Sequence, residues 1–336
     1  PDTSIADLIG EVDPIKVAEG RYLSDELTLH YGLVPRTNRG IFAINELPDL
    51  AERIQVGLLN VLEERDVQIR GYKIRLPLDV MLVASANPDD YTNRGRIITP
   101  LKDRFGSQIR THYPLEVATE VAIIEQESRP ASIGDVEVVV PDFMKEVIAT
   151  FSHLARQSNH ISQRSGVSVR LSVSNYEIMC ANAVRRALRA GETNVAPRVS
   201  DLEALAASTS GKVEIESLEE GREGAILEQI VKAAVLQVYK RLATPATVHI
   251  DKVNEILAAF ESGTLAHAGE DITSAQLVQL LSDIPALKSV VEVFVGANAT
   301  PAVQASGVEF VLEGLHLSKR LNKDASGVRA TYRAKA

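Results

Sequence analysis

The feature that most constrains the fold is a short apolar run, Ile41 to Ile44, that is followed directly by the polar pair Asn45 and Glu46. Four consecutive apolar residues after a glycine predict a strand that is buried on both faces, as in a parallel sheet. Open α/β sheets bind their ligands at the carboxyl ends of the strands. The amide and the carboxylate therefore mark a candidate site at a strand end, although such residues also begin ordinary loops.

The segments after this strand continue an α/β pattern. Residues 47–66 place apolar side chains on one helical face, and residues 67–77 alternate apolar and polar residues around Gly71, which predicts a β-hairpin. Residues 78–88, LDVMLVASANP, contain a second buried-type strand that ends at Asn87. A strand, a helix and another strand, with a hairpin inserted, predict a parallel α/β sheet.

The pattern becomes helical from about residue 141. Apolar residues at three- and four-residue steps predict helices over residues 141–157, 174–191 and 223–242. The stretch between the second and third helices is polar and rich in breakers, so we expect a loop or a short insert there. Further short helices are predicted beyond residue 247, and the last dozen residues, which are basic and polar, are expected to fray.

The composition sets limits on the class of protein. The chain has 336 residues, 45% of them hydrophobic, which is enough for two or three packed units. A formal net charge of -9 disfavours broad binding to nucleic acid or to anionic membranes. The single cysteine, Cys180, excludes an intrachain disulfide and suits a reducing cytosol. No apolar run reaches the roughly 18 residues of a membrane helix, and no His-Glu-x-x-His zinc motif occurs.

Three further residues are candidates for chemistry. The amide of Asn87 can hydrogen-bond both a phosphate oxygen and a water molecule, but an Asn-Pro pair also commonly opens a turn. Arg104 can reach across a subunit boundary to a phosphoryl group, and the alternative is an ion pair with Asp103. Arg170 precedes a predicted helix and can fold back onto phosphates, and the alternative is a solvated side chain.

In their order, these segments resemble AAA+ ATPases of the group that contains the magnesium-chelatase I subunit and the MoxR ATPases. GIFAINEL is similar to a Walker B strand, the hairpin is similar to that group's insert, and LVASANP is similar to sensor 1. LKDRFG resembles an arginine-finger motif and GVSVR resembles sensor 2. The resemblance runs from about residue 8 to residue 185.

The resemblance implies a role for each candidate residue. It implies ATP and Mg²⁺ as cofactors, with Asn45 in the metal shell and Arg170 against the nucleotide. Glu46 would polarise the attacking water, Asn87 would contact that water and the γ-phosphate, and Arg104 would act on the ATP of a neighbouring subunit.

The resemblance also implies a domain organisation and a function. Residues 1–135 would form part of an AAA+ α/β core, residues 136–245 an all-α lid with sensor 2, and residues 246–336 a C-terminal helical region. The protein would be a cytoplasmic ring, expected to be a hexamer, that uses ATP to remodel a partner protein or to insert a metal or cofactor into it. A partner with a von Willebrand-type domain is expected, because such partners are common in this group.

Two departures from the family pattern keep other functions open. Asn45 replaces the usual first acid of Walker B, and no Gly-x4-Gly-Lys-Ser/Thr phosphate loop occurs; TSGKVE at residues 209–214 lacks the first glycine and the hydroxyl. We expect the chain to begin downstream of that loop, and ATP hydrolysis depends on the loop being present in the full-length protein. The alternative is a non-hydrolysing scaffold or regulatory subunit.

Two other classes within the superfamily are disfavoured by the sequence. An enhancer-dependent transcription activator would carry a Gly-Ala-Phe-Thr-Gly-Ala loop, which is absent. A replicative helicase relative is disfavoured by the acidic charge balance.

Overall fold

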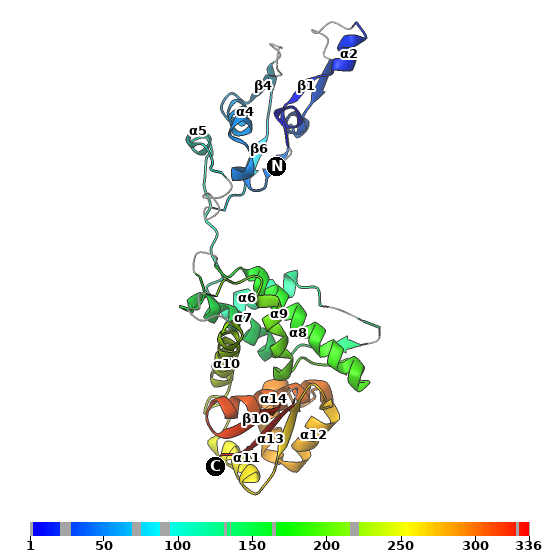
Figure 1. The fold of residues 1–336 in the computed structure, drawn as a ribbon, viewed down its shortest axis with the longest axis vertical. Coiled ribbons are helices and arrows are strands. Elements are labelled where there is room, and N and C mark those ends of the chain that lie inside the picture. Colours follow the sequence, from blue (N-terminus) through cyan, green and yellow to red (C-terminus); the bar gives the residue numbers. More distant parts are fainter. Residues whose placement is uncertain are drawn as a thin grey trace. The chain divides into compact units, whose positions relative to one another are not determined.

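The chain forms two compact units, residues 1–111 and 112–336 (Figure 1). The computed structural model describes residues 3–20, 28–68, 75–87, 95–130, 133–134, 136–162, 166–215, 222–326 and 329–335. The boundary predicted at residue 135 lies inside the second unit. The reason is that α6 (Val117–Glu127) packs on α7 (Asp142–Gln157) and α8 (Val169–Ala190), as part of one helical core.

The first unit is built around a parallel pair of strands, as predicted. β3 (Ile41–Ile44) pairs with β6 (Met81–Ala84), so that Ile44 lies opposite Ala84. α4 (Glu52–Glu63) follows β3 and buries Ile54 and Leu58 in one hydrophobic cluster with Ile44. The apolar stripe of this helix therefore covers the face of the sheet to which Ile44 points.

The predicted hairpin is confirmed at its base. β4 (Asp66–Gln68) pairs antiparallel with β5 (Arg75–Pro77), and its tip, residues 69–74, lies outside the described residues. The remaining elements of the unit are short: α1 (Ile5–Leu8), the antiparallel strands β1 (Gly10–Val12) and β2 (Leu29–Tyr31), α2 (Pro14–Ala18), α3 (Leu33–Arg36) and α5 (Thr99–Lys102).

The second face of the β3–β6 sheet is uncovered within the described residues. Ile41, Met81 and Val83 keep 66%, 64% and 44% of their surface exposed. Ile41 pairs with Met81, and Val83 pairs with Ala43, so these side chains share one face. The prediction that the strands are buried on both faces is therefore wrong for the described chain, because α4 covers one face and no other described element covers the opposite one.

The second unit has a helical core. α7, α8, α10 (Glu223–Leu242) and α14 (Pro301–Leu317) contribute most of its buried side chains, and the rings of Phe143 and Phe310 stack with centroids 4.4 Å apart. The other elements are β7 (Glu137–Val138), β8 (Asn194–Val195), the 3-10 helix η4 (Val199–Ala204), α9 (Leu205–Thr209), α11 (Ile250–Glu261), α12 (Ser274–Asp283) and α13 (Pro285–Val295).

The C-terminal segment forms a sheet. β10 (Leu321–Ser326) and β9 (Ala266–Gly269) both pair antiparallel with β11 (Arg329–Ala334), which lies between them. Tyr332 keeps 2% of its surface exposed, and its hydroxyl donates to Glu313 at 2.5 Å. The expectation that this segment frays is wrong, because Leu321 and Tyr332 are buried while Arg329 and Arg333 pair with acids at the surface.

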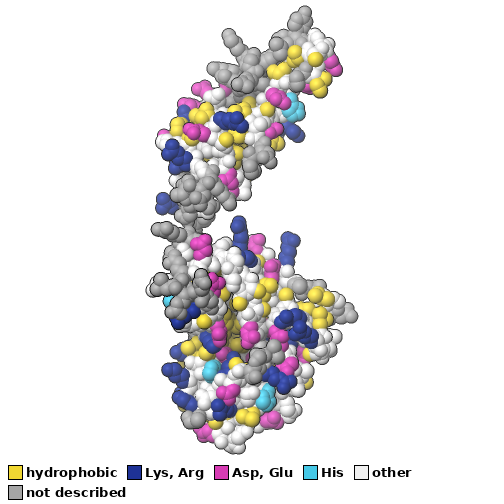
Figure 2. Space-filling view, in the orientation of Figure 1, with side chains coloured by type: hydrophobic (Ala, Val, Ile, Leu, Met, Phe, Trp, Pro, Cys, Tyr) yellow, Lys and Arg dark blue, Asp and Glu magenta, His cyan; other side chains and the backbone are white. Residues whose placement is uncertain are grey.

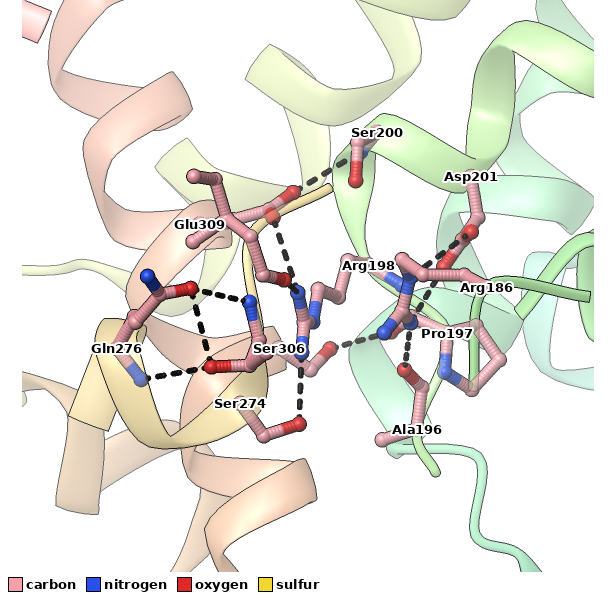
Figure 3. A network of polar contacts seen from close by, with 12 residues as sticks. Arg186, Ala196, Pro197, Arg198, Ser200, Asp201, Ser274, Gln276, Ser306 and Glu309 are labelled. Atoms are coloured by element: carbon pink, nitrogen blue, oxygen red, sulfur yellow. Dashed lines mark hydrogen bonds and ion pairs between the residues drawn. The ribbon is translucent and has the colours of Figure 1, made fainter. Parts of the chain in front are cut away.

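A buried polar network holds η4 against α8 and α12 (Figure 3). Arg186 Nη2 donates to Asp201 Oδ2 at 2.9 Å, and the backbone N–H of Arg198 donates to the same oxygen at 2.8 Å. The Arg198 guanidinium donates to Ile272 O and Ser274 Oγ, each at 2.7 Å. Both guanidinium groups are buried almost completely, so the network depends on full pairing of its charges.

The two arginines respond differently to burial. For Arg186, burial by itself lowers the pKa, but the charge of Asp201 and the hydrogen bond to it raise the pKa above its ordinary value. For Arg198, burial and the neighbouring charge of Arg186 lower the pKa, and nearby carboxylates offset only part of that effect. Asp201 is therefore the carboxylate on which the Arg186 cation most directly depends, whereas Glu309 is the first of the carboxylates that support Arg198.

The surface carries mixed charge. On the face drawn in Figure 2, Lys and Arg side chains are interspersed with Asp and Glu side chains over both units. None of the described helices combines the length and the apolar character that a bilayer-crossing helix needs.

Candidate functional site

The carboxyl ends of β3 and β6 lie side by side and are joined through Ser85. Ser85 N donates to Ile44 O, and Leu47 N donates to Ser85 O, both at 2.9 Å. The Ser85 hydroxyl donates to Asn45 Oδ1 at 2.7 Å and accepts from Glu46 N at 3.0 Å. We call Asn45, Glu46 and Ser85 the strand-end cluster.

Glu46 has an unusual backbone conformation. Its φ of 53° and ψ of 58° lie in the left-handed region, which few residues other than glycine adopt. The side chain is partly exposed, and its carboxylate has no hydrogen-bond or ion-pair partner among the described residues. Backbone strain of this kind costs about 1–3 kcal/mol and persists where surrounding contacts enforce it. Here the two hydrogen bonds of Ser85 to Glu46 N and Leu47 N enforce it.

Replacing Glu46 by glycine is expected to stabilise the first unit by about 0.5–1 kcal/mol, because glycine adopts a positive φ without steric cost. Hydrogen exchange of a peptide that covers residues 41–47 measures this gain. The matched control is Glu52→Gly, which replaces a residue in α4 and is expected to lower the stability by up to about 1 kcal/mol. A loss of protection in Glu46→Gly would show that the left-handed backbone is not strained.

Asn45 and Asn87 are the amide residues at the same edge of the sheet. Asn87 is exposed and comes three residues after the end of β6. The Oδ1 atom of Asn45 already accepts the Ser85 hydroxyl, so it has one lone pair left for another partner. Both residues thus follow neighbouring parallel strands, where ligands of α/β sheets bind.

The strand-end cluster fits a contribution to a magnesium shell and does not fit a complete metal site. No group of three or more His, Cys, Asp or Glu side chains that could hold a metal occurs in the described parts of the chain. Mg²⁺ usually keeps several waters and takes one or two protein oxygens together with substrate phosphates. Asn45 and Glu46 can supply such oxygens only beside a bound nucleotide.

Arg104 lies at the other end of α4. Its Nε donates to Glu63 Oε2 at 2.9 Å, and its Nη1 donates to Pro100 O at 2.7 Å. Glu63 is the last residue of α4, and Glu46 lies before Glu52, the first residue of that helix. Arg104 and Glu46 therefore lie toward opposite ends of α4. Arg104 is therefore ion-paired, as the alternative interpretation had it, but with Glu63 rather than Asp103.

Arg170 belongs to the second unit. It is the second residue of α8, its side chain is exposed, and its backbone N–H donates to Ser168 Oγ at 3.2 Å in an N-terminal cap. The helix begins five residues before the predicted start, because Ser168 and not Ser174 caps it. Contact of Arg170 with a nucleotide stays a prediction.

Two polar residues of the first unit were missed by the sequence analysis: Ser85, which holds the strand-end cluster together, and Gln55, which joins α4 to residues 96–98. Ile44 and Ala84 lie opposite each other at the ends of the paired strands. Ser85 comes directly after Ala84, as Asn45 comes directly after Ile44, so Ser85 lies beside Asn45 and Glu46. Gln55 is 1% exposed; its Nε2 donates to Leu50 O and Arg96 O, and its Oε1 accepts from Ile98 N. The sequence signal that could have identified Gln55 is its position next to the apolar stripe of α4. A glutamine there is expected to be buried, and a buried amide needs hydrogen-bond partners.

One comparison with known proteins bears on the first unit. Residues 18–101 match the family model described as the Sigma-54 interaction domain, a match that spans both parallel strands and ends within α5. The structure is also similar to one titled "crystal structure of a putative ATPase from Cytophaga hutchinsonii", with 17% identity and coverage of 69% of this chain and 74% of that chain. Its TM-score of 0.27 is too low to support an argument. Among curated proteins, no significant relative was found.

The predicted fold class is confirmed. The first unit contains the parallel strands, the intervening helix and the inserted hairpin of a partial AAA+-like core, and a largely helical region follows it.

Proposed function

We propose that the protein is an AAA+ ATPase subunit that couples ATP binding and hydrolysis in an oligomeric ring to work on a partner protein. One observation carries this proposal: Glu46 is held in a left-handed conformation at the end of β3, beside the end of β6, and its carboxylate has no partner among the described residues. Strained backbone at the carboxyl edge of a parallel sheet is typical of a functional site rather than of a plain loop.

The strand-end residues would divide the work at the γ-phosphate. The Glu46 carboxylate would accept a proton from the attacking water, and the Asn87 amide would orient that water and hold a phosphate oxygen. Ser85 would act as a positioning residue, because its hydroxyl fixes both the Glu46 backbone and the Asn45 side chain. Bound Mg²⁺ would neutralise charge on the phosphates, and Asn45 would contribute an oxygen to its shell.

Arg104 would act on the nucleotide of a neighbouring subunit. Its ion pair with Glu63 lies at the end of α4 that is opposite to Glu46 of the same chain. A guanidinium that serves a neighbouring site requires a head-to-tail contact between subunits, and such contacts form a ring when the rotation between subunits closes. We infer a ring, with a hexamer as the expected size, and we infer that Arg170 is a further contact of the nucleotide.

The finer parts of the proposal rest on the family resemblance. The hairpin between α4 and β6 supports the magnesium-chelatase and MoxR group, whose clients include proteins with a von Willebrand-type domain. The work would then be remodelling of such a partner, or insertion of a metal or cofactor into it, in the cytoplasm. The 336 residues contain no Gly-x4-Gly-Lys-Ser/Thr sequence, so hydrolysis requires a phosphate loop that these residues do not supply.

A non-hydrolysing scaffold or regulatory subunit is the second candidate. The observation that favours it is Asn45, whose amide oxygen is bonded to Ser85 where a Walker B acid would carry a charge. The match to the Sigma-54 interaction domain also makes contact with a sigma factor a candidate activity, although the Gly-Ala-Phe-Thr-Gly-Ala loop is absent from the sequence.

Mixing two inactive variants of the full-length protein tests the shared site. Arg104→Ala and Glu46→Gln are each expected to hydrolyse ATP at least 100-fold more slowly than the unaltered protein. In a one-to-one mixture, about a quarter of the interfaces combine an intact glutamate with an intact arginine, so about a quarter of the activity should return.

The control is Arg110→Ala, which removes an exposed arginine six residues after Arg104 and is expected to keep its activity without mixing. A mixture no more active than its parts would contradict the shared site. Absence of hydrolysis in the unaltered full-length protein would favour the scaffold.

A further inference from the structure

A cavity in the second unit is separate from the strand-end cluster. It has a volume of about 560 Å³ and lies among η4, α9, α10, α14 and the C-terminal sheet. Small-molecule sites in proteins commonly have volumes of about 300–1,000 Å³ and combine apolar walls with a few convergent polar groups. The apolar part of the lining is formed by Phe151, Val199, Leu202, Leu205, Leu227 and Val231.

Two buried polar atoms at this cavity lack hydrogen-bond partners in the part of the chain that the structure describes. Glu309 is 1% exposed, and its Oε2 accepts from Ser200 N at 3.0 Å. Its Oε1 accepts no hydrogen bond; the Arg198 Nη1 atom lies 3.9 Å away, at ion-pair distance (Figure 3). The Ser200 hydroxyl is likewise buried without a partner, and both residues line the cavity. Buried polar atoms of this kind are costly unless a ligand or water satisfies them.

The cationic side chains at the cavity are already paired. Lys323 Nζ lies 2.8 Å from Glu313 Oε2, Lys232 Nζ lies 2.5 Å from Glu228 Oε1, and Arg329 pairs with Asp271. The Tyr332 hydroxyl also donates to Glu313. Burial and the charge of Glu313 hold the pKa of Tyr332 well above its usual value, so this hydroxyl keeps its proton. The cavity therefore offers no spare cation to an anionic ligand among its described lining residues.

Acidic groups at the cavity are in excess. Glu203 lines it without a hydrogen-bond or ion-pair partner in the described chain. Burial is the largest cause that raises the pKa of the Glu203 carboxyl; the charge of Lys323 comes next and lowers the pKa, and the smaller effects of Glu270, Glu228 and Glu309 raise it. The described lining of the cavity holds five glutamates against two lysines and one arginine, and this balance favours a positively charged ligand.

We propose that this cavity binds a small organic cation, namely an apolar body that carries a primary ammonium group. The ammonium would donate to Glu309 Oε1 and Ser200 Oγ, and the apolar body would lie against the side chains of α9 and α10. An ammonium supplies the donors that both unpartnered atoms lack. This proposal does not depend on the proposed ATP chemistry.

The test uses the 336-residue chain and two fluorescent probes that differ in charge. Dansylcadaverine, which ends in a primary ammonium, is expected to bind saturably with a blue shift of its emission. Dansyl-6-aminohexanoate, which ends in a carboxylate, is expected to bind at least about 10-fold more weakly. Equal affinity for both probes, or saturable binding of neither, would overturn the proposal.

Variants locate the binding. Glu309→Gln is expected to weaken the binding of dansylcadaverine at least about 10-fold, and Ser200→Ala is expected to weaken it about 3-fold, because each substitution removes one acceptor atom. Glu255→Gln alters an exposed acid on α11 and is the matched control, expected to change affinity less than about 2-fold. Unchanged affinity in both Glu309→Gln and Ser200→Ala would refute the site.

Because Glu309 also faces Arg198, circular dichroism must first show that Glu309→Gln is folded. If it is not, Ser200→Ala and the cavity-filling variant Val231→Trp decide the question. Val231 is only partly buried, and tryptophan there is expected to abolish saturable binding. Retained binding in a folded Val231→Trp would place the probe elsewhere and refute the proposal.

Discussion

Replacing Glu46 by glutamine is expected to slow ATP hydrolysis by the full-length protein at least 100-fold while nucleotide binding is retained. A positioned general base contributes about 10²–10⁴-fold to a rate, and glutamine keeps the size and hydrogen-bonding reach of glutamate without the basic oxygen. The left-handed backbone and both Ser85 hydrogen bonds to Glu46 and Leu47 involve main-chain atoms, so the substitution leaves them in place.

The measurement combines steady-state phosphate release with the affinity for a fluorescent ATP analogue. Glu64→Gln, at the exposed end of α4, is the matched control and is expected to change the rate less than about 2-fold. An unchanged rate in Glu46→Gln would remove Glu46 from the chemistry. A loss of both binding and hydrolysis would instead indicate a structural role.

Replacing Asp201 by alanine is expected to lower the free energy of unfolding of the second unit by about 3–5 kcal/mol, because removing one partner of a buried ion pair leaves the other charge uncompensated. Asp201 accepts from the Arg186 guanidinium and from the backbone of Arg198, and all three residues are buried. The charge of Asp201 also raises the pKa of Arg198, after the charges of Glu309 and Glu192, so this cation loses part of its support when Asp201 is removed.

Urea unfolding monitored by circular dichroism measures the loss. Asp283→Ala, at the exposed end of α12, removes a carboxylate that only accepts from Gln279 and is expected to change stability by less than about 0.5 kcal/mol. A loss below about 1 kcal/mol in Asp201→Ala would show that water or backbone movement compensates the two arginines.

The sequence predicted those elements whose side chains follow one clear period. The apolar face of α4, the alternating base of the hairpin and the helices α7 and α10 all appear where the pattern placed them. The parallel pairing of β3 with β6 was also predictable, because a helix and a hairpin separate two apolar runs. Local periodicity is sufficient for such elements, since each buries a face that the pattern identifies.

The remaining features depend on partners distant in the sequence. The segment that forms β11 was expected to fray because it contains basic residues and their acidic partners were not known. In the fold, Arg329 pairs with Asp271 and Arg333 pairs with Asp324. The support of Glu46 by Ser85 spans 39 residues and becomes visible only once the register of the two strands is known. The same holds for Glu309 and Ser200, which lie 109 positions apart and meet only when α14 packs on η4.

The order of strands in the C-terminal sheet has a consequence for synthesis of the protein. β11 lies between β9 and β10 and is the last of the three to leave the ribosome. Until it emerges, neither earlier strand has its neighbour, and the acceptor Glu313 lacks the hydroxyl of Tyr332. The second unit must therefore complete its sheet after translation has passed residue 334, and a nascent chain stalled before that point carries two open strand edges that invite pairing with other chains.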